Sequence, residues 1–148
     1  MLIGVPKEIK PQENRIGLTP KSVQDLTSNG HKVLVENNGG FEAGFYNNQY
    51  IKAGATIVNK AEDIFNDSEI IVKVKEPLNN EIKMIKENQI VFTYLHLAAA
   101  KELTEGLVKS KAICIAYETV TDNNGRLPLL APMSAVAEEC QFKQEHIL

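Results

Sequence analysis

The sequence lacks the features that mark several large classes of protein. Its 148 residues include only two cysteines, Cys114 and Cys140, too few for a disulfide framework and without the spacing of a zinc site. No apolar run approaches the ~20 residues that a membrane helix needs, and the N-terminus does not have the form of a signal peptide. The net charge is −3, so the basic surface typical of nucleic-acid binding is missing. These absences predict a cytoplasmic protein that binds neither membrane nor nucleic acid.

Two site motifs are missing as well. No Gly-x-Gly-x-x-Gly follows a predicted strand, and the spacing of Gly39, Gly40 and Gly44 does not fit that dinucleotide motif, so these glycines indicate loop structure. His31 and His146 are remote in sequence from any metal-ligand pattern, so no metal site is expected. The length suits one domain with a core of its own.

What the sequence does contain is an alternation of apolar strands and amphipathic helices. Thr19 followed by Pro20 predicts a helix start, which Gly30 would close. Further helices are expected from Asn79 or Asn80 to Lys86 and from Lys101 to Lys109. Strands are expected at residues 2–5, 31–36, 55–58, 70–77, 90–95 and 112–117. The alternation predicts a doubly wound α/β fold of the Rossmann or flavodoxin type, with a mostly parallel sheet and helices on both faces.

Polar residues follow several of these strands. Because parallel strands end at one edge of a sheet, where open α/β sheets bind their ligands, we expect these side chains to gather there. Taken alone, each is as well explained by surface charge, or, for a histidine, by packing in the core. Their convergence favours a site for a small anion. The residues are Lys7, Glu8, Lys75, Glu76, His96 and Glu118, with Arg15 on the loop after the first strand.

Three of these residues suggest a particular chemistry. The planar guanidinium of Arg15 suits a carboxylate, which it can bind with two charge-assisted hydrogen bonds. Lys75 could stabilise a carbonyl oxygen as it gains negative charge, and His96 could transfer a proton near neutral pH. Together these groups meet the needs of a 2-oxo acid whose carbonyl is reduced or aminated.

The sequence also closely resembles a known family, the alanine dehydrogenases. The likeness runs from Met1 to about Ala137 and rests on several stretches that are jointly very specific. They are Ile3-Gly4-Val5-Pro6-Lys7-Glu8, Glu13-Asn14-Arg15-Ile16-Gly17-Leu18-Thr19-Pro20, Val72-Lys73-Val74-Lys75-Glu76-Pro77, Phe92-Thr93-Tyr94-Leu95-His96-Leu97-Ala98, Ile115-Ala116-Tyr117-Glu118-Thr119-Val120 and Leu129-Leu130-Ala131-Pro132-Met133-Ser134.

This resemblance implies that residues 1–137 are the N-terminal, substrate-binding domain of an enzyme of L-alanine catabolism. The family catalyses the reversible, NAD-dependent oxidative deamination of L-alanine to pyruvate and ammonium, and its members are homo-oligomers, typically hexamers. By resemblance, Arg15 and Lys75 bind the substrate, His96 is the catalytic acid and base, and Met133 and Ser134 lie near the nicotinamide of NAD. The domain that holds most of the NAD, with a catalytic aspartate, is absent, so this chain alone is expected to be inactive.

Two alternatives remain at this point. The first is a fragment of the NAD-binding subunit of proton-translocating transhydrogenase, a relative in which a lysine and a histidine do not stand at the positions of Lys75 and His96. The second is a non-catalytic module that retains affinity for pyruvate. Lys75 and His96 favour alanine dehydrogenase over the transhydrogenase.

The resemblance ends abruptly after Ala137. The family continues roughly as Gly-Arg-Met-Ser-Val-Gln-Thr-Gly-Ala-His, whereas residues 138–146 are Glu-Glu-Cys-Gln-Phe-Lys-Gln-Glu-His. Deleting one base from the first codon of a possible coding of the family segment gives these nine residues. We therefore expect residues 138–148 to be a frameshifted tail, from a disrupted gene or a sequencing error. Genuine divergence at a domain boundary is the alternative.

Overall fold

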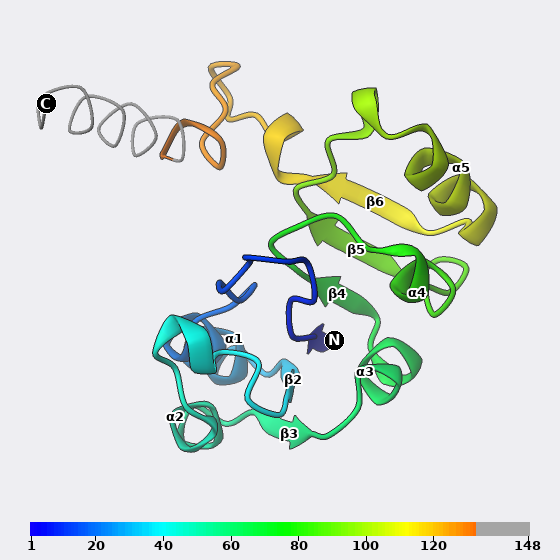
Figure 1. Cartoon of the computed structure of the whole chain (residues 1–148). Helices are drawn as coiled ribbons and strands as arrows, with labels where there is room; N and C mark the ends of the chain where they lie inside the picture. The colour runs from blue at the N-terminus through cyan, green and yellow to red at the C-terminus, as the bar shows by residue number, and fades with distance from the viewer. Residues whose placement is uncertain (133–148) are drawn as a thin grey trace, which may run out of the picture.

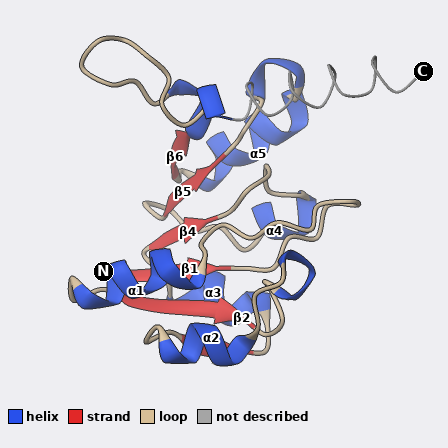
Figure 2. Ribbon diagram, turned by 90° about the vertical axis from the view of Figure 1, so that its left-hand side faces the viewer, coloured by secondary structure: helices blue, strands red, loops and turns tan. Residues whose placement is uncertain are grey.

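A six-stranded parallel sheet forms the centre of the computed structural model, which describes residues 1–132. The strands lie in the order β3-β2-β1-β4-β5-β6, and helices cover both faces (Figures 1 and 2). The strands are β1 (Leu2–Val5), β2 (Lys32–Glu36), β3 (Thr56–Val58), β4 (Ile70–Val72), β5 (Ile90–Thr93) and β6 (Ile113–Ala116). The α-helices are α1 (Pro20–Ser28), α2 (Asn47–Lys52), α3 (Ala61–Asp67), α4 (Asn79–Ile82) and α5 (Lys101–Ser110). The predicted doubly wound fold is therefore confirmed.

The strand order places a switch point between β1 and β4. From β1 the chain moves outward through β2 to β3, then returns to the other side of β1 and continues through β4 and β5 to β6. Ile3 accordingly pairs with Val33 on one side and with Ile70 on the other. Because the crossovers leave the switch point in opposite directions, the carboxyl ends of β1 and β4 flank the crevice where such sheets bind ligands.

An apolar cluster lies on each face of the sheet. On one face, Val23 of α1 and Tyr50 of α2 pack with Val35 of β2. On the other, the helices α3, α4 and α5 cover a cluster that includes Phe65 of α3 and Val91 of β5. Fully burying one such side chain contributes about 1.5–3 kcal/mol, so these two layers hold the strand ends in fixed positions.

The loop before α1 is fixed at both ends. The Thr19 hydroxyl accepts a hydrogen bond from the backbone N–H of Ser22 at 3.2 Å, which confirms the predicted helix start. At Gly17 an added Cβ would lie 2.5 Å from the carbonyl oxygen of Val72. Only glycine lets the loop approach β4 so closely, and this approach brings the neighbouring Arg15 to the switch point.

The strand predicted over residues 70–77 is shorter than expected, because β4 ends at Val72. On the β5 side the pairing continues, since the N–H of Lys73 donates to Phe92 and the N–H of Tyr94 donates to Val74. On the β1 side no strand carbonyl meets the N–H of Val74, which donates instead to the carboxylate of Glu8 at 2.6 Å. A side chain thus replaces the strand partner that β1 no longer supplies.

The helix predicted through Lys86 is also shorter, because α4 ends at Ile82. After that point the N–H of Met84 bonds to the carbonyl of Glu81, three residues back, and the N–H of Lys86 bonds to the side chain of Gln89. These contacts tighten and then end the turn. The tail from Glu138 lies outside the described residues, so its origin stays a prediction.

Candidate functional site

The polar residues that follow β1, β4, β5 and β6 lie at one edge of the sheet, as predicted. Glu8 bonds to the backbone that follows β4, and Glu118 bonds to the backbone N–H of Leu95 and of His96 beyond β5, at 3.1 and 2.8 Å. These contacts cross between neighbouring strands at their carboxyl ends. The sequence pattern therefore located the correct edge of the sheet.

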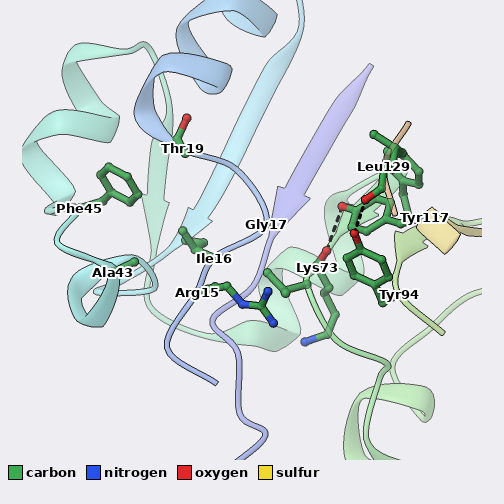
Figure 3. Close-up of a pocket in the computed structure, with 12 residues that line it drawn as sticks. Arg15, Ile16, Gly17, Thr19, Ala43, Phe45, Lys73, Tyr94, Tyr117 and Leu129 are labelled. Carbon is green, nitrogen blue, oxygen red and sulfur yellow. Dashed lines mark hydrogen bonds between the residues drawn. The ribbon is translucent and has the colours of Figure 1, made fainter. Parts of the chain in front are cut away.

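A cavity of about 480 Å³ opens at this edge, within the range of small-molecule pockets. Figure 3 shows Arg15 on one side and the rings of Tyr94 and Tyr117 on the other. Of the three residues to which the sequence assigned chemistry, Arg15 lines the cavity, whereas Lys75 and His96 do not. The remaining lining residues are Ile16, Gly17, Thr19, Ala43, Phe45, Lys73, Val74, Phe92 and Leu129.

Arg15 is held in place by Glu13. Its Nε donates to Glu13 Oε1 at 2.8 Å and its Nη2 donates to Glu13 Oε2 at 2.7 Å, so the two side chains form a bidentate ion pair. These hydrogen bonds from Arg15, with a further contribution from the charge of Lys75, lower the pKa of Glu13 to about 2. The pair is therefore fully ionised at neutral pH.

A buried charged triad lies beneath the cavity, and the sequence analysis missed it. The ammonium of Lys73, which is 0% exposed, lies 3.2 Å from Glu8 Oε2 and 2.7 Å from Glu81 Oε1. The second oxygen of Glu81 accepts the N–H of Leu78 at 2.9 Å, and the second oxygen of Glu8 accepts backbone N–H groups after β4, so both oxygens of each carboxylate have a partner. A buried charge is tolerated when it is paired and hydrogen-bonded in this way.

Lys75 lies directly beyond this triad. Its backbone carbonyl accepts a hydrogen bond from the hydroxyl of Thr93 at 2.8 Å. Burial opposes ionisation of Glu76, but the hydrogen bond from Lys10, a backbone hydrogen bond and the charges of Lys10 and Lys75 together outweigh that effect and lower the pKa of Glu76. Within residues 1–132, no carboxylate forms an ion pair with the Lys75 ammonium. The charge of Lys75 is therefore available to an anion.

His96 occupies a tight turn just after β5. Its backbone is left-handed, with φ at 49°, and its side chain is 60% exposed. The Nδ1 atom lies 3.8 Å from Glu118 Oε1. Burial opposes ionisation of Glu118, but backbone hydrogen bonds from His96, Glu118 and Leu95, with a smaller contribution from the nearby His96 ring, together outweigh that effect and lower the pKa of Glu118. The imidazole is therefore open to solvent on one side and faces a carboxylate on the other.

Two tyrosines complete the cavity wall, and they too were missed. The hydroxyl of Tyr117 donates to the carbonyl of Lys73 at 2.9 Å, and that of Tyr94 donates to the carbonyl of Leu129 (Figure 3). Their rings pack edge to face with centroids 4.8 Å apart. Burial raises the pKa of both hydroxyls, so they stay protonated. Each tyrosine lies near the end of a predicted strand, at residues 90–95 and 112–117, but just beyond the observed strands β5 and β6. Their position near the carboxyl ends of the strands was the available signal.

The described residues do not fit a bound dinucleotide. Fingerprint loops bring glycines and a helix N-terminus to a pyrophosphate, whereas β1 ends at Val5, the next residues are Pro6, Lys7 and Glu8, and the next helix begins only at Pro20. Met133 and Ser134 lie outside the described residues. Across residues 1–132, no cluster of three metal-ligating side chains forms, and no helix has the length and apolarity to cross a membrane.

Known proteins match this chain along most of its length. A family model described as "Alanine dehydrogenase/PNT, N-terminal domain" matches residues 4–137. The chain is 53% identical over 137 residues to the alanine dehydrogenase of Staphylococcus epidermidis, which covers 93% of this chain and 37% of that protein. For the alanine dehydrogenase of Bacillus subtilis the identity is 50%, over 93% of this chain and 36% of that protein.

Solved structures give the same result. An L-alanine dehydrogenase superposes with a TM-score of 0.87 at 53% identity, covering 90% of this chain and 37% of that chain. A transhydrogenase from Sinorhizobium meliloti superposes with a TM-score of 0.78 at 25% identity, covering 84% of this chain and 35% of that one. This chain thus spans little more than a third of the length of the relatives that it matches.

Proposed function

Because this chain belongs to the family of alanine dehydrogenase and PNT N-terminal domains, we propose that it is the substrate-binding domain of an alanine dehydrogenase. The reaction is the reversible conversion of L-alanine, water and NAD⁺ to pyruvate, ammonium, NADH and a proton. By resemblance, the complete enzyme is a cytoplasmic homo-oligomer, and this domain alone is inactive.

The observation that carries the proposal is the position of Arg15. It lies on the rim of an apolar cavity at the switch point, where a small carboxylate would meet a guanidinium and apolar walls together. A two-carbon or three-carbon 2-oxo acid would place its carboxylate on Arg15 and its apolar end toward Phe92 and Tyr94, which line the cavity.

Lys75 and His96 complete the proposed roles. In our proposal the Lys75 ammonium approaches the substrate's carbonyl oxygen and stabilises the charge that develops there. His96 exchanges protons with the substrate as the carbonyl, carbinolamine and imine interconvert. Glu118 lies 3.8 Å from His96 Nδ1. Both residues stand beside the cavity and not in its wall, so we infer that the substrate contacts them at its open side.

NAD takes up the hydride in the proposed reaction. The residues described here do not fit it, so we assign its binding mainly to a second domain. Met133 and Ser134, which match family positions near the nicotinamide, are proposed as this chain's contribution.

The transhydrogenase alternative has less support. The match to the Sinorhizobium meliloti protein is 25% identical, against 53% for the alanine dehydrogenase structure. The combination of Lys75 and His96 also favours alanine dehydrogenase. A non-catalytic pyruvate-binding module remains the second candidate, because the cavity and Arg15 are present in the chain as it stands.

A chimeric enzyme tests the proposal. Residues 1–137 of this chain would replace the matching segment of the Staphylococcus epidermidis alanine dehydrogenase, and alanine-dependent formation of NADH would be measured. We expect activity, and we expect Lys75→Ala to reduce kcat by about 10²–10³-fold, the effect of removing one group that stabilises a developing oxyanion. Lys60→Ala, an exposed lysine before α3, is the control and should change kcat less than twofold.

The outcomes separate the candidates. A folded chimera that binds pyruvate but forms no NADH would support the binding module and refute the enzyme. Equal effects of Lys75→Ala and Lys60→Ala would refute the role of Lys75.

A further inference from the structure

The Glu13 carboxylate forms hydrogen bonds to one edge of the Arg15 guanidinium and leaves the other edge open. Its Oε1 accepts from Nε at 2.8 Å and from the backbone N–H of Arg15 at 3.0 Å, while its Oε2 accepts from Nη2 at 2.7 Å. A guanidinium has five N–H groups in a planar fork. Both hydrogens of Nη1 and one of Nη2 remain, and no partner for Nη1 occurs within residues 1–132.

The two members of the pair differ in exposure. The Glu13 side chain is 8% exposed, whereas that of Arg15 is 50% exposed. Glu13 is therefore packed into the loop, where it also closes a local turn through the backbone N–H of Arg15. It is part of the scaffold, and a ligand can reach Arg15 without displacing it.

We propose that Glu13 is the positioning and specificity-determining residue of this site: it fixes the plane of Arg15, presents the Nη1–Nη2 edge to the ligand, and restricts the ligand to a single carboxylate. The inference rests on the proposed function, since it takes Arg15 as the carboxylate site. One remaining edge can bind one carboxylate through two hydrogen bonds.

The negative charge of Glu13 is what restricts the ligand to a single carboxylate. A second negative charge on so small a ligand is repelled by the Glu13 carboxylate. This repulsion opposes the attraction of the Lys75 ammonium, which Glu13→Gln leaves unchanged. The expected ligand is therefore a small monocarboxylate, such as pyruvate, and not a dicarboxylate of the same size.

Pyruvate and oxalate provide a matched pair of probes. They have nearly the same shape, but oxalate carries a second negative charge in place of a methyl group. Affinities for the 148-residue chain would be measured by titration followed through the backbone amide signals near Arg15. We expect the native chain to bind pyruvate more tightly than oxalate, although oxalate has the larger charge.

Glu13→Gln keeps the size of the side chain and one acceptor, but removes the charge and the second hydrogen bond. We expect the ratio of oxalate affinity to pyruvate affinity to rise about tenfold, the factor that corresponds to 1.4 kcal/mol of removed repulsion. Glu13→Asp, which keeps the charge, should retain the native preference. Glu105→Gln is the control, because Glu105 pairs with Lys101 on the exposed surface of α5, and it should leave the ratio unchanged.

The ratio distinguishes the alternatives. If Glu13 merely competed with ligands for Arg15, Glu13→Gln would strengthen the binding of both probes equally. If its role were only to stabilise the loop, both would weaken equally, and either result overturns the proposal. Oxalate bound more tightly than pyruvate by the native chain would overturn it without any variant. Pyruvate binding with an unchanged ratio defeats this inference alone, whereas no binding of either probe defeats the proposed function as well.

Discussion

Replacing Lys73 by methionine would remove the cation between two buried carboxylates. The native ammonium is 0% exposed and lies 3.2 Å from Glu8 and 2.7 Å from Glu81. Removing one partner of a buried ion pair typically costs about 3–5 kcal/mol, because a buried charge is left without compensation. Most single domains have a total stability of about 5–15 kcal/mol, so the variant should be only marginally folded.

The matched control is Lys21→Met. Lys21 pairs with Asp25 at 2.8 Å, nearly the distance of the Lys73–Glu81 pair, but these two side chains are 75% and 62% exposed. Exposed pairs contribute about 0–1 kcal/mol. Urea unfolding followed by circular dichroism should therefore show a large fall in midpoint for Lys73→Met and almost none for Lys21→Met.

A compensating substitution sharpens the test. Adding Glu81→Gln to Lys73→Met removes one of the two uncompensated charges, so the double variant should be more stable than Lys73→Met alone. Equal midpoints for Lys73→Met and Lys21→Met would refute the buried triad. A double variant less stable than Lys73→Met would show that the loss comes from packing and not from charge.

Three further predictions follow from the site. Glu13 has its pKa lowered from 4.5 to about 2 in the folded chain, so the unfolded state binds more protons and the stabilising effect of the pair is lost as the pH falls through this window. The urea midpoints of the native chain and Glu13→Gln should therefore differ above pH 5 and converge near pH 2, and a constant difference would contradict this. Gly17→Ala would place a Cβ 2.5 Å from the backbone of Val72, which should cost about 1–3 kcal/mol and weaken pyruvate binding in the titration. Gly106→Ala, whose Cβ would meet only a side chain of α4 at 3.0 Å, should be tolerated; equal losses would argue against the close approach. In the chimeric enzyme, His96→Ala should flatten the pH dependence of kcat near neutrality, and an unchanged profile would exclude proton transfer by His96.

The edge of the sheet could be predicted from the sequence because it depends on local signals. Apolar runs that end at a polar residue mark the carboxyl end of a strand, and the alternation with helices makes the strands parallel. Together these two facts bring Glu8, Lys75, His96 and Glu118 to one edge without any knowledge of contacts. The structure confirms that edge through the hydrogen bonds that Glu8 and Glu118 make to neighbouring strands.

The triad could not be predicted because its members show no local sign of pairing. Lys73 and Glu8 are 65 residues apart. In the alternation of Val72, Lys73, Val74 and Lys75, the two lysines have the same signature, although one is fully buried and the other half-buried. Glu81 looks like an ordinary acidic residue in the first turn of a helix. Only the long-range packing of β4 against the chain after β1 distinguishes the buried lysine from the one that is open to a ligand.

The buried triad and the proposed binding residues are mechanically connected. Apolar residues of the same volume would often stabilise such a core as well as a buried ion network does, so stability alone is a weak explanation for Glu8, Lys73 and Glu81. Glu8, however, also accepts the N–H of Val74 at 2.6 Å and that of Lys75 at 3.4 Å. The network therefore sets the backbone position from which the Lys75 side chain begins. Glu8→Gln preserves one acceptor oxygen and removes the charge. We expect this variant to keep the fold but to shift the backbone at Lys75. The free energy of pyruvate binding should therefore fall by more than the free energy of unfolding that urea measures.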